Sequence, residues 1–340
     1  MLSRLWIGRI ALALVASTAV VASAIGCGSS SDGDEPPLDV DNDSGIVTGG
    51  IYDVVYTQER RAGAYASSGH AVAVYGVADE ASELSQQCKN DGYATQSTKT
   101  GANAACTIVV CTDPLPDGDD DGGTGYTPDS PQPTSGAVTL TTTLVPAGVT
   151  MTPDESGICT TGDDPVAAQW WTGGDNAITV SSVGGLVPAI RRTGLVGPGE
   201  LSSITFDGLE LTGSADAGAD PDAGEPDPDS DFTGPTVTLS RGKPVAVTFA
   251  GGIAGTSIHL VLQTQSTAQE RVIDCTFDGA QTSQTLPAAD LSSLLVTDDG
   301  DVIGGYYVDT LTQSAAKSGS WNIQARLVEL GPDAPLVVGN

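Results

Sequence analysis

The six cysteines are residues of this sequence whose thiols are chemically reactive. Apart from Cys27 there are five of them, and outside the cytosol such cysteines pair by default. Because five is an odd number, we expect one thiol to stay free or to bond between chains. Cys106 and Cys111 are five residues apart in one predicted strand, so they should face opposite sides of it. The disulfide candidates are Cys88, Cys106, Cys111, Cys159 and Cys275.

Three kinds of disulfide pairing are open. Cys88 could bond to Cys106 or Cys111 and staple a small N-terminal block, which would gain most from a cross-link. Cys159 could bond to Cys275 and tie two later blocks together. A bond from the first block to a later one is equally open. Zinc is not expected, because there is no Cys-x₂-Cys spacing and the chain has only two histidines. We expect no metal and no cofactor.

Catalytic motifs are absent from the sequence. It contains no G-x-S-x-G, no H-E-x-x-H, no P-loop and no G-x-G-x-x-G. His70 and His259 each lie on a predicted strand, where a single histidine is usually a surface residue or a satisfied core residue. Glu200, Asp207 and Glu210 lie in or near strands, with nothing that singles them out as the carboxylate pair of a glycosidase. We therefore expect no enzyme, with a hydrolase of unrecognised site as a distant alternative.

Two pairs of neighbouring aromatic residues could serve binding instead. Trp170-Trp171 and Tyr306-Tyr307 both fall on predicted strands, so one member of each pair should face the core and the other should face outward. An exposed aromatic ring on a sandwich can stack on a sugar or seat a peptide. Trp171 and Tyr307 are the ligand-binding candidates, while packing in the core is the commoner use of such rings.

Calcium binding is suggested by one short acidic motif. Residues 39–45 read DVDNDSG, with Asp at positions 1, 3 and 5 as in an EF-hand loop. Position 6 is Ser44 rather than Gly, and position 12 is Gly50 rather than the bidentate Glu. The motif is therefore interpreted as a solvated acidic spacer that retains only weak calcium association through its charge.

The N-terminus has the pattern of a bacterial export signal. Arg4 and Arg9 precede an apolar run over 10–25, which is short for a bilayer-spanning helix. The run ends in Ala24-Ile25-Gly26-Cys27, which resembles the bacterial lipobox. That resemblance implies cleavage before Cys27 and its acylation with three chains, enough for a stable membrane anchor. Gly28 follows where Asp would retain a lipoprotein at the inner membrane, so we expect the outer membrane.

Acidic, low-complexity segments divide the mature chain. The protein has 13 Lys and Arg against 43 Asp and Glu, a formal charge of −30, which argues against nucleic-acid binding. Segments rich in Asp, Pro and Gly cannot bury a core and should be extended, self-repelling spacers. The predicted divisions are a signal peptide (1–26), a tether (27–45), two linkers (113–134 and 213–234), a tail (331–340) and three blocks between them.

The three blocks (46–112, 135–212 and 235–330) are rich in β-strand signals. Short runs of Thr, Val and Ile separated by Gly-rich turns are typical of antiparallel sandwiches. A short helix is expected over 79–88, and one or two helical turns over 286–294. The predicted fold class is all-β: tandem Ig-like antiparallel β-sandwich modules after a small, disulfide-containing, β-rich (α+β) module, joined by acidic disordered linkers.

An internal echo leads to a family resemblance. Residues 166–174 (VAAQWWTGG) resemble 245–252 (VAVTFAGG), each interpreted as a strand, an aromatic and a Gly-Gly hairpin turn. With the lipobox and the final strand at Trp321, this plan resembles lipoproteins of Gram-negative bacteria that carry Ig-like β-sandwich modules. The resemblance implies location and fold but no activity. We expect a non-catalytic binding or adhesion module for a protein or glycan ligand, or alternatively a structural subunit of an envelope assembly.

Overall fold

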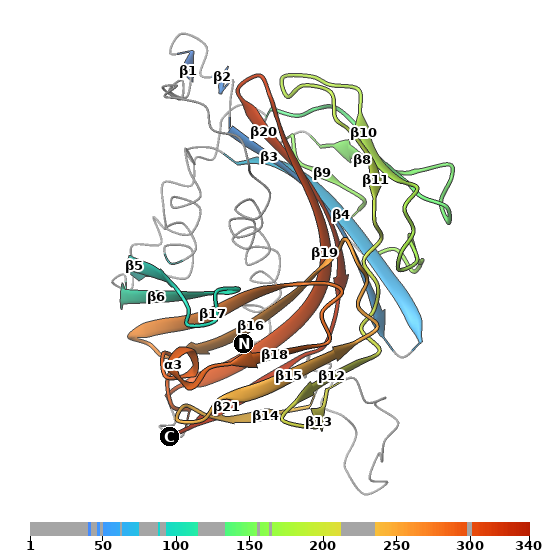
Figure 1. Cartoon of the computed structure of the whole chain (residues 1–340). Coiled ribbons are helices and arrows are strands. Elements are labelled where there is room, and N and C mark those ends of the chain that lie inside the picture. Colours follow the sequence, from blue (N-terminus) through green and yellow to red (C-terminus); the bar gives the residue numbers. More distant parts are fainter. Residues whose placement is uncertain are drawn as a thin grey trace, which may run out of the picture.

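The computed structural model of the chain is built almost entirely from β-strands (Figure 1). It describes residues 40–41, 46–47, 50–61, 63–74, 88, 93–114, 133–154, 157–162, 165–211, 235–297 and 301–340. Signal peptide 1–26, Cys27 and most of the tether and the two linkers lie outside these residues, as does the helix expected over 79–88, except for Cys88. Among the described residues, no helix has the length and apolarity needed to cross a bilayer.

The strands of the N-terminal half are mostly short. They are β1 (Val40–Asp41), β2 (Ile46–Val47), β3 (Gly50–Arg61), β4 (Ala64–Val74), β5 (Tyr93–Thr100), β6 (Cys106–Pro114), β7 (Val138–Thr141), β8 (Val149–Pro153), β9 (Cys159–Thr160), β10 (Ile178–Ser182), β11 (Arg191–Leu195), β12 (Ser203–Phe206) and β13 (Leu209–Glu210).

The C-terminal half contains the longest strands and one short helix. Its elements are β14 (Val237–Ser240), β15 (Val245–Ala250), β16 (Ser257–Gln265), β17 (Gln269–Asp278), β18 (Ser283–Leu286), α3 (Ala288–Leu291), β19 (Ile303–Ser318), β20 (Trp321–Leu330) and β21 (Asp333–Gly339). Helix α3 follows Pro287 and confirms the helical turn expected over 286–294. Residues 331–340, expected to be a tail, contain β21, which pairs with β14 and β19.

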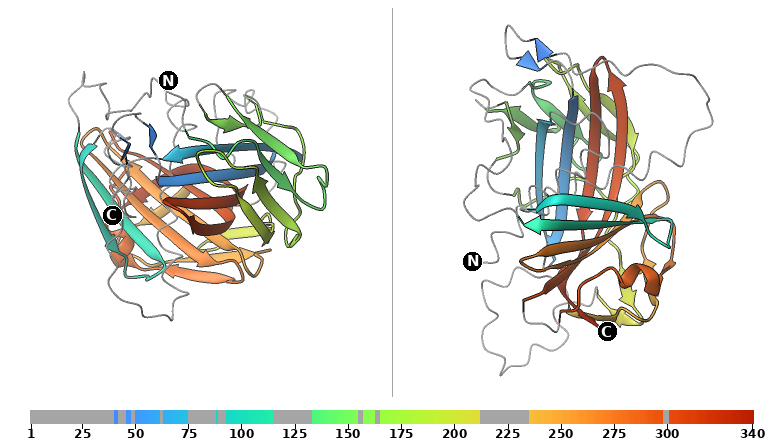
Figure 2. Two further views of the ribbon diagram at one scale, coloured as in Figure 1. Left: turned by 90° about the horizontal axis from the view of Figure 1, so that it is seen from above. Right: turned by 90° about the vertical axis from the view of Figure 1, so that its left-hand side faces the viewer.

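One long, twisted sheet runs through the molecule and combines strands from all three predicted blocks. Its central strands follow the order β4-β3-β20-β19-β16-β17-β6-β5. The β3–β20 pair is parallel and unites the first block with the third, as does the antiparallel pair of β6 with β17. Figure 2 shows β5 and β6 crossing the direction of β3 and β20, the result of the right-handed strand twist accumulating across the sheet.

The blocks therefore do not each close a sheet of their own. Strands β19 and β20 are 16 and 10 residues long, and each needs partners along its whole length. Strand β3, from the first block, supplies one of these partners. The small first block could not bury both faces of its strands alone, since short chains bury too little surface. The block boundaries stay a prediction, but the sheets extend across them.

Two apolar cores lie against this shared sheet and make the architecture sandwich-like. In one, the sheet β13-β12-β15-β18 packs over β16, β17 and β19, with Phe249, Phe277 and Leu260 among its buried residues. In the other, β7, β8 and β10 pack over β3, β4 and β20, around Trp170 and Met151. The predicted all-β, sandwich-like fold class with disulfides is thus confirmed.

The hairpin that the sequence predicts at residues 166–174 and again at 245–252 is absent from both places. Residues 166–171 form no strand, and only Val166 makes an isolated bridge, to Ser67. Strand β15 is present, but it pairs with β12 and β18, whereas the following β16 belongs to the long sheet. The Gly-Gly turn therefore connects two different sheets of the sandwich. Gly251 takes φ +87°, and a Cβ on Gly252 would lie 2.1 Å from the carbonyl oxygen of Gly279.

Candidate functional site

A cavity of about 130 Å³ opens beside the first of the two apolar cores, which contributes Leu201, Ile204, Leu211 and Val308 to its lining. The ends of β3 and β20 form one side, and the segment before β12 forms the other. Its lining combines carboxylates and one guanidinium with an apolar floor. The lining residues are Glu59, Arg60, Glu200, Leu201, Ile204, Leu211, Val308, Thr310, Glu329, Leu330, Gly331 and Pro332.

Glu329, on β20, is the buried carboxyl group of this cavity. The residue is only 3% exposed. Its Oε2 accepts a hydrogen bond from Nε2 of Gln58 on β3, whereas its Oε1 has no hydrogen-bond partner. A buried polar atom without a partner is rare in native proteins and generally marks a bound water, a ligand or a functional role.

Gln58 fixes the position of the Glu329 carboxyl because both polar atoms of its own amide make hydrogen bonds. Its Oε1 accepts the backbone N–H groups of Trp170 at 3.0 Å and Trp171 at 3.3 Å. Its Nε2 donates to the carbonyl oxygen of Trp171 as well as to Glu329. The irregular segment around the two tryptophans thus determines which way the Gln58 amide points, and the amide in turn orients Glu329.

The protonation of Glu329 follows from its surroundings. Burial is the largest cause that raises the pKa of this carboxyl to about 8, the nearby Glu200 and Glu59 carboxylates act in the same direction, and the Gln58 hydrogen bond and Arg60 only partly oppose them. The carboxyl is therefore mostly protonated at neutral pH. A perturbed carboxyl in a cavity is a candidate functional group.

An exposed ion pair borders the opening of the cavity. Arg60 Nη1 lies 3.2 Å from Glu200 Oε2, and both side chains are about half exposed. The Arg60 guanidinium also lies 5.9 Å from the ring centroid of Tyr65, in a cation–π contact. Such an exposed pair contributes little to stability, but it positions two opposite charges beside the opening.

The wall opposite β20 is tied to β19 by two threonine hydroxyls. Thr310 Oγ1 donates to the Gly199 carbonyl at 2.7 Å, and Thr312 Oγ1 donates to that of Val196 at 2.5 Å. These bonds fix the segment that carries Glu200 and Leu201, so the cavity is preformed. No group of three or more His, Cys, Asp or Glu in the described part of the chain could hold a metal.

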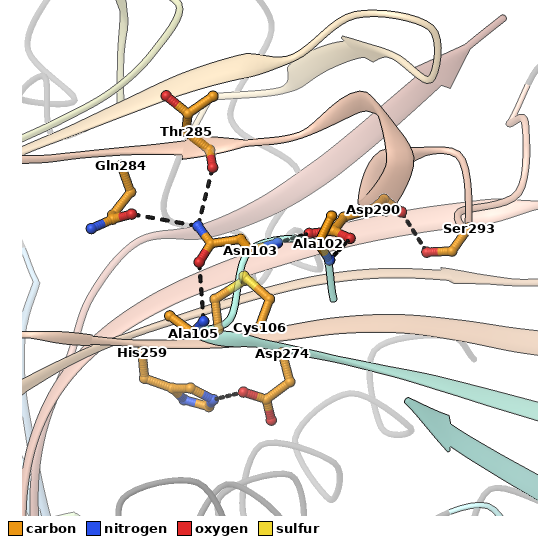
Figure 3. Close-up of a disulfide and its surroundings, with 11 residues drawn as sticks. Ala102, Asn103, Ala105, Cys106, His259, Asp274, Gln284, Thr285, Asp290 and Ser293 are labelled. Atoms are coloured by element: carbon orange, nitrogen blue, oxygen red, sulfur yellow. Dashed lines mark hydrogen bonds and ion pairs between the residues drawn. A yellow bond between two sulfur atoms is a disulfide. The ribbon is translucent and has the colours of Figure 1, made fainter. Parts of the chain in front are cut away.

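His259 belongs to a second buried polar group, on the other side of the long sheet. Its Nε2 lies 2.9 Å from Asp274 Oδ1 (Figure 3). Its ring meets that of Tyr307 edge-on, with the two ring centroids 5.5 Å apart. Burial opposes protonation of His259, but the Asp274 carboxylate outweighs it and raises the histidine pKa. On the paired strand, burial raises the pKa of Asp309 to about 6. His259 Nδ1 has no partner, so the histidine is a core residue that is only half satisfied.

The predicted aromatic binding residues are buried, which corrects the expectation that one of each pair faces outward. Trp170 and Trp171 are 1% and 0% exposed, and the Trp171 indole donates to the carbonyl of Pro198. They do not lie on a strand, so the alternation of strand faces does not apply to them. Tyr306 and Tyr307 do lie on β19, but both faces of this sheet are packed, and Tyr307 belongs to a small apolar cluster with Val261 and Val272.

The structure assigns four of the cysteine candidates to two disulfides. Cys88 bonds to Cys111, one of the two options for stapling the first block. Cys106 bonds to Cys275 and links β6 to β17 (Figure 3), so the alternative pairing of Cys159 with Cys275 is wrong. Cys106 and Cys111 belong to different apolar clusters, as expected for opposite faces of one strand. Cys159 is free and buried.

The loop beside the second disulfide is held by a buried carboxylate. Asp290, on α3, accepts the backbone N–H groups of Ala102 and Asn103 (Figure 3). The Asn103 amide then donates to the Thr285 carbonyl at 3.1 Å. The tip of the β5–β6 hairpin is therefore fixed to the body of the sandwich both covalently and through hydrogen bonds.

Sequence reasoning considered Glu200 but missed Glu329 and Gln58. Glu329 follows Leu327 and Val328 and precedes Leu330 in a strand that is otherwise buried. A single acid within an apolar run was the available signal, because burying a carboxyl is costly and needs a reason. Asp207 and Glu210 do not line the cavity. The Asp207 carboxylate accepts a hydrogen bond from the Ala246 N–H, and the Glu210 carboxylate accepts one from the Ser203 hydroxyl.

Comparison with known proteins identifies no family. No family model matches the chain, and no curated protein matches it. Among solved structures, the FN1–FN3 domains of chicken CNTN1 are similar with a TM-score of 0.16 and 10% identity, over 69% of this chain and 66% of that one. A tetra-tandem repeat from the extending region of a large adhesion protein gives 0.17 and 15%, over 80% and 56%. The chain thus spans less than two thirds of the length of either of these solved chains. The fold is therefore described from the strands and sheets of this protein alone.

Proposed function

We propose that the protein is a lipid-anchored cell-envelope protein that acts as a non-catalytic binding module for a protein ligand. The observation that carries the envelope location is the presence of two disulfides, Cys88–Cys111 and Cys106–Cys275, which persist in oxidising compartments. The lipobox ending at Cys27 supports the same location and supplies the anchor. Gly28 favours the outer membrane. The acidic charge favours partners other than nucleic acid.

The choice of a protein over a glycan follows from where the aromatic rings lie. Sugar binding on a sandwich needs an exposed aromatic face, and Trp171 and Tyr307 do not offer one. The cavity beside Glu329 is instead a small recess of about 130 Å³ bordered by the Arg60–Glu200 ion pair, which supports a single side chain of a protein as its occupant over a sugar chain.

The location is tested by protease treatment of intact cells that express the full chain. The acidic linkers should be cut readily wherever the enzyme reaches them. Loss of the protein from intact cells would support a surface-exposed binding module, while protection until lysis would support a periplasmic one. A Cys27→Ala variant should lose labelling by a palmitate analogue and leave the membrane fraction, and retention of both in that variant would overturn the lipid anchor.

A second candidate function is a structural subunit of an envelope assembly. Within the described residues, the path of the long sheet ends at β11 and β5, and a terminal strand can pair with another chain. Arg191 on β11 is exposed. Cross-linking of a cysteine placed at Arg191 to another envelope protein in cells would favour this role, and recovery of the monomer alone would exclude it.

A further inference from the structure

We propose that the loop between β10 and β11 rests on the membrane that carries the lipid anchor, with Val183 and Leu186 inserted among the lipid headgroups and Arg191 beside their phosphates. The inference rests on the lipid anchor of the proposed function and adds a second contact with the same bilayer. It is carried by two exposed apolar side chains on a fixed loop, by the charge near that loop, and by the point where the tether joins the sheet.

The two apolar side chains of the loop point away from the protein. Val183 and Leu186 are 83% and 59% exposed, the two largest exposed fractions among the large apolar side chains of the described residues. Val187 and Ile190, in the same loop, are buried in the second apolar core. Neighbouring apolar side chains that face water cost free energy until another surface covers them, and such patches mark contacts with proteins or membranes.

Backbone hydrogen bonds fix the conformation of this loop. The Gly184 N–H donates to the Ser135 carbonyl at 2.8 Å, and the Val187 N–H donates to the Thr134 carbonyl at 3.3 Å. A Cβ on Gly185 would lie 2.5 Å from the Thr134 carbonyl oxygen, so the loop packs tightly against this neighbouring segment. Because the loop is already ordered, docking on a surface costs it little conformational entropy.

The charge near the loop suits a phospholipid headgroup. Strands β7, β8, β10 and β11, at this end of the long sheet, contain no Asp or Glu, although the chain has 43 of them. Arg191 and Arg192 begin β11 directly after the loop, and Arg191 is exposed. Basic side chains beside an apolar wedge bind the phosphates of a membrane surface. The loop therefore offers both groups that an interfacial contact needs.

The loop lies beside the point where the tether joins the long sheet. The Thr134 hydroxyl lies 3.5 Å from the hydroxyl of Tyr52, near the start of β3. Residues 28–49 separate Cys27 from β3 and can span at most on the order of 70 Å. A tether of this length keeps the bilayer at a high effective concentration near the loop, so a small apolar contact is enough to hold it there.

The contact also gives the protein an orientation. Gly50 begins β3 at the end where the loop lies, and Glu59 of the cavity lining is near the other end of the same strand. Nine residues of strand separate the two, a distance of about 30 Å. A loop that rests on the bilayer would thus leave the cavity at the far end of β3, where a protein ligand can reach it.

The experiment measures contact with lipid on the full, acylated chain, reconstituted into vesicles of phosphatidylethanolamine and phosphatidylglycerol. A nitrobenzoxadiazole label is attached to Ala189→Cys, an exposed position of the loop, while the free Cys159 is buried. Doxyl-labelled lipids quench this fluorophore only on contact, so most of its fluorescence should be lost. The control label is on Leu209→Cys in β13, which lies at the opposite end of the molecule from β10 (Figure 1), and should stay bright.

Three sets of variants identify the side chains that make the contact. Val183→Ser/Leu186→Ser keeps the backbone hydrogen bonds of the loop and should restore most of the fluorescence of the Ala189→Cys label. Leu144→Ser, at another exposed apolar position, is the matched control and should behave as the wild type. Arg191→Gln should lower the docking equilibrium about fivefold on vesicles that contain phosphatidylglycerol. Unchanged docking by Arg191→Gln would overturn the assignment of this residue.

The proposal fails if the wild-type loop label is not quenched, or if Val183→Ser/Leu186→Ser is quenched as fully as the wild type. If the double variant does not fold, the comparison of the Ala189→Cys and Leu209→Cys labels decides alone, and equal quenching of the two overturns the proposal. Cross-linking of a photoreactive group on Leu186→Cys to an envelope protein in cells, without quenching in vesicles, would assign the loop to a protein partner and overturn the membrane contact.

This test is separate from the test of the anchor. Acylation of Cys27 with no quenching of the loop label would remove the loop contact and leave the proposed function standing. Quenching of the loop label in a chain whose Cys27 carries no lipid would leave the loop contact standing and remove the anchor.

Discussion

Gln58 and Glu329 lie directly opposite each other on the parallel strands β3 and β20, and the Gln58 amide donates to the Glu329 carboxyl at 2.5 Å. The two residues are 271 positions apart in the chain. The same amide accepts the backbone N–H groups of Trp170 and Trp171. The Gln58 side chain thus connects its own strand β3, the neighbouring strand β20 and the irregular segment that contains Trp170 and Trp171.

Replacing Gln58 should therefore destabilise the whole protein. Gln58→Met has similar volume but leaves the two tryptophan N–H groups without their acceptor, and an unsatisfied buried group costs about 1–3 kcal/mol. We expect the free energy of unfolding to fall by about 3 kcal/mol, measured by urea denaturation. Gln281→Met is the matched control, since Gln281 is exposed and its replacement should cost little stability. A small effect at Gln58 would show that the tryptophan segment is not held by this amide.

Stability should decrease as the pH rises from 5 to 8. A carboxyl whose pKa is raised on folding binds its proton more tightly in the native state, so stability is lost as the pH passes from the unfolded value to the folded one. This applies to Glu329, raised to about 8, and to Asp309, raised to about 6. The raised pKa of His259 acts in the same direction, because its stabilisation is lost as the histidine deprotonates.

Each such group contributes at most about 1.4 kcal/mol per pH unit within its window. Burial lowers the pKa of His70, which opposes this trend below about pH 6.5, so urea midpoints should fall most clearly between pH 6.5 and 8.5. In Glu329→Gln the slope between pH 6 and 8 should shrink markedly. A wild-type curve that is flat or rises over this range would contradict the protonated state of Glu329.

The neighbours Tyr306 and Tyr307 should respond to the same substitution with opposite signs. The Tyr306 hydroxyl donates to the Pro235 carbonyl at 2.9 Å, so Tyr306→Phe should cost about 1 kcal/mol. The Tyr307 hydroxyl is buried without a partner, so Tyr307→Phe removes an unsatisfied group and should stabilise by up to about 1 kcal/mol. The measurement is thermal and urea unfolding of both variants. Equal losses in the two would mean that the Tyr307 hydroxyl has a partner in solution.

The two disulfides should differ in their contributions to stability. Cys106–Cys275 closes a separation of 169 residues, and Cys88–Cys111 closes one of 23. Chain-entropy arguments assign about 5 kcal/mol to the longer loop and about 3 kcal/mol to the shorter. The double variants Cys106→Ala/Cys275→Ala and Cys88→Ala/Cys111→Ala, compared by urea unfolding, should show this order. Cys159→Ala controls for removing a buried thiol, and the reverse order would mean that the unfolded chain is already restrained.

Local patterns predicted most of the strands but not their partners. The alternation in 50–57, 203–206 and 321–328 is short-range information, and strands are found at each of these places. The 166–171 run has the same local pattern and forms no strand, since its backbone groups bond instead to the Gln58 side chain. Tertiary contacts of this kind override propensity.

The candidate site could not be predicted from the sequence for the same reason, because it depends on tertiary contacts. Gln58 and Glu329 meet only because β3 pairs in parallel with β20, and no turn or spacing in the sequence indicates that pairing. The odd number of cysteines predicted one thiol without a partner in the chain, and the spacing of Cys106 and Cys111 predicted that they face opposite sides of their strand. The partner of Cys275 depends on β6 lying beside β17, which is again a long-range contact.

The parallel pairing of β3 with β20 also decides when this protein can acquire its structure. Residues 50–61 pair on one edge with the next strand β4, but the neighbour on their other edge is formed by residues 321–330, which lie far away in the sequence. A fold with contacts so distant in sequence has a high contact order and forms slowly. The β3–β4 hairpin must therefore wait, with the free edge of β3 exposed, until residues 321–330 have been synthesised. A chain that stops short of β20 leaves one edge of β3 without a partner strand, and aggregation can begin at that open edge.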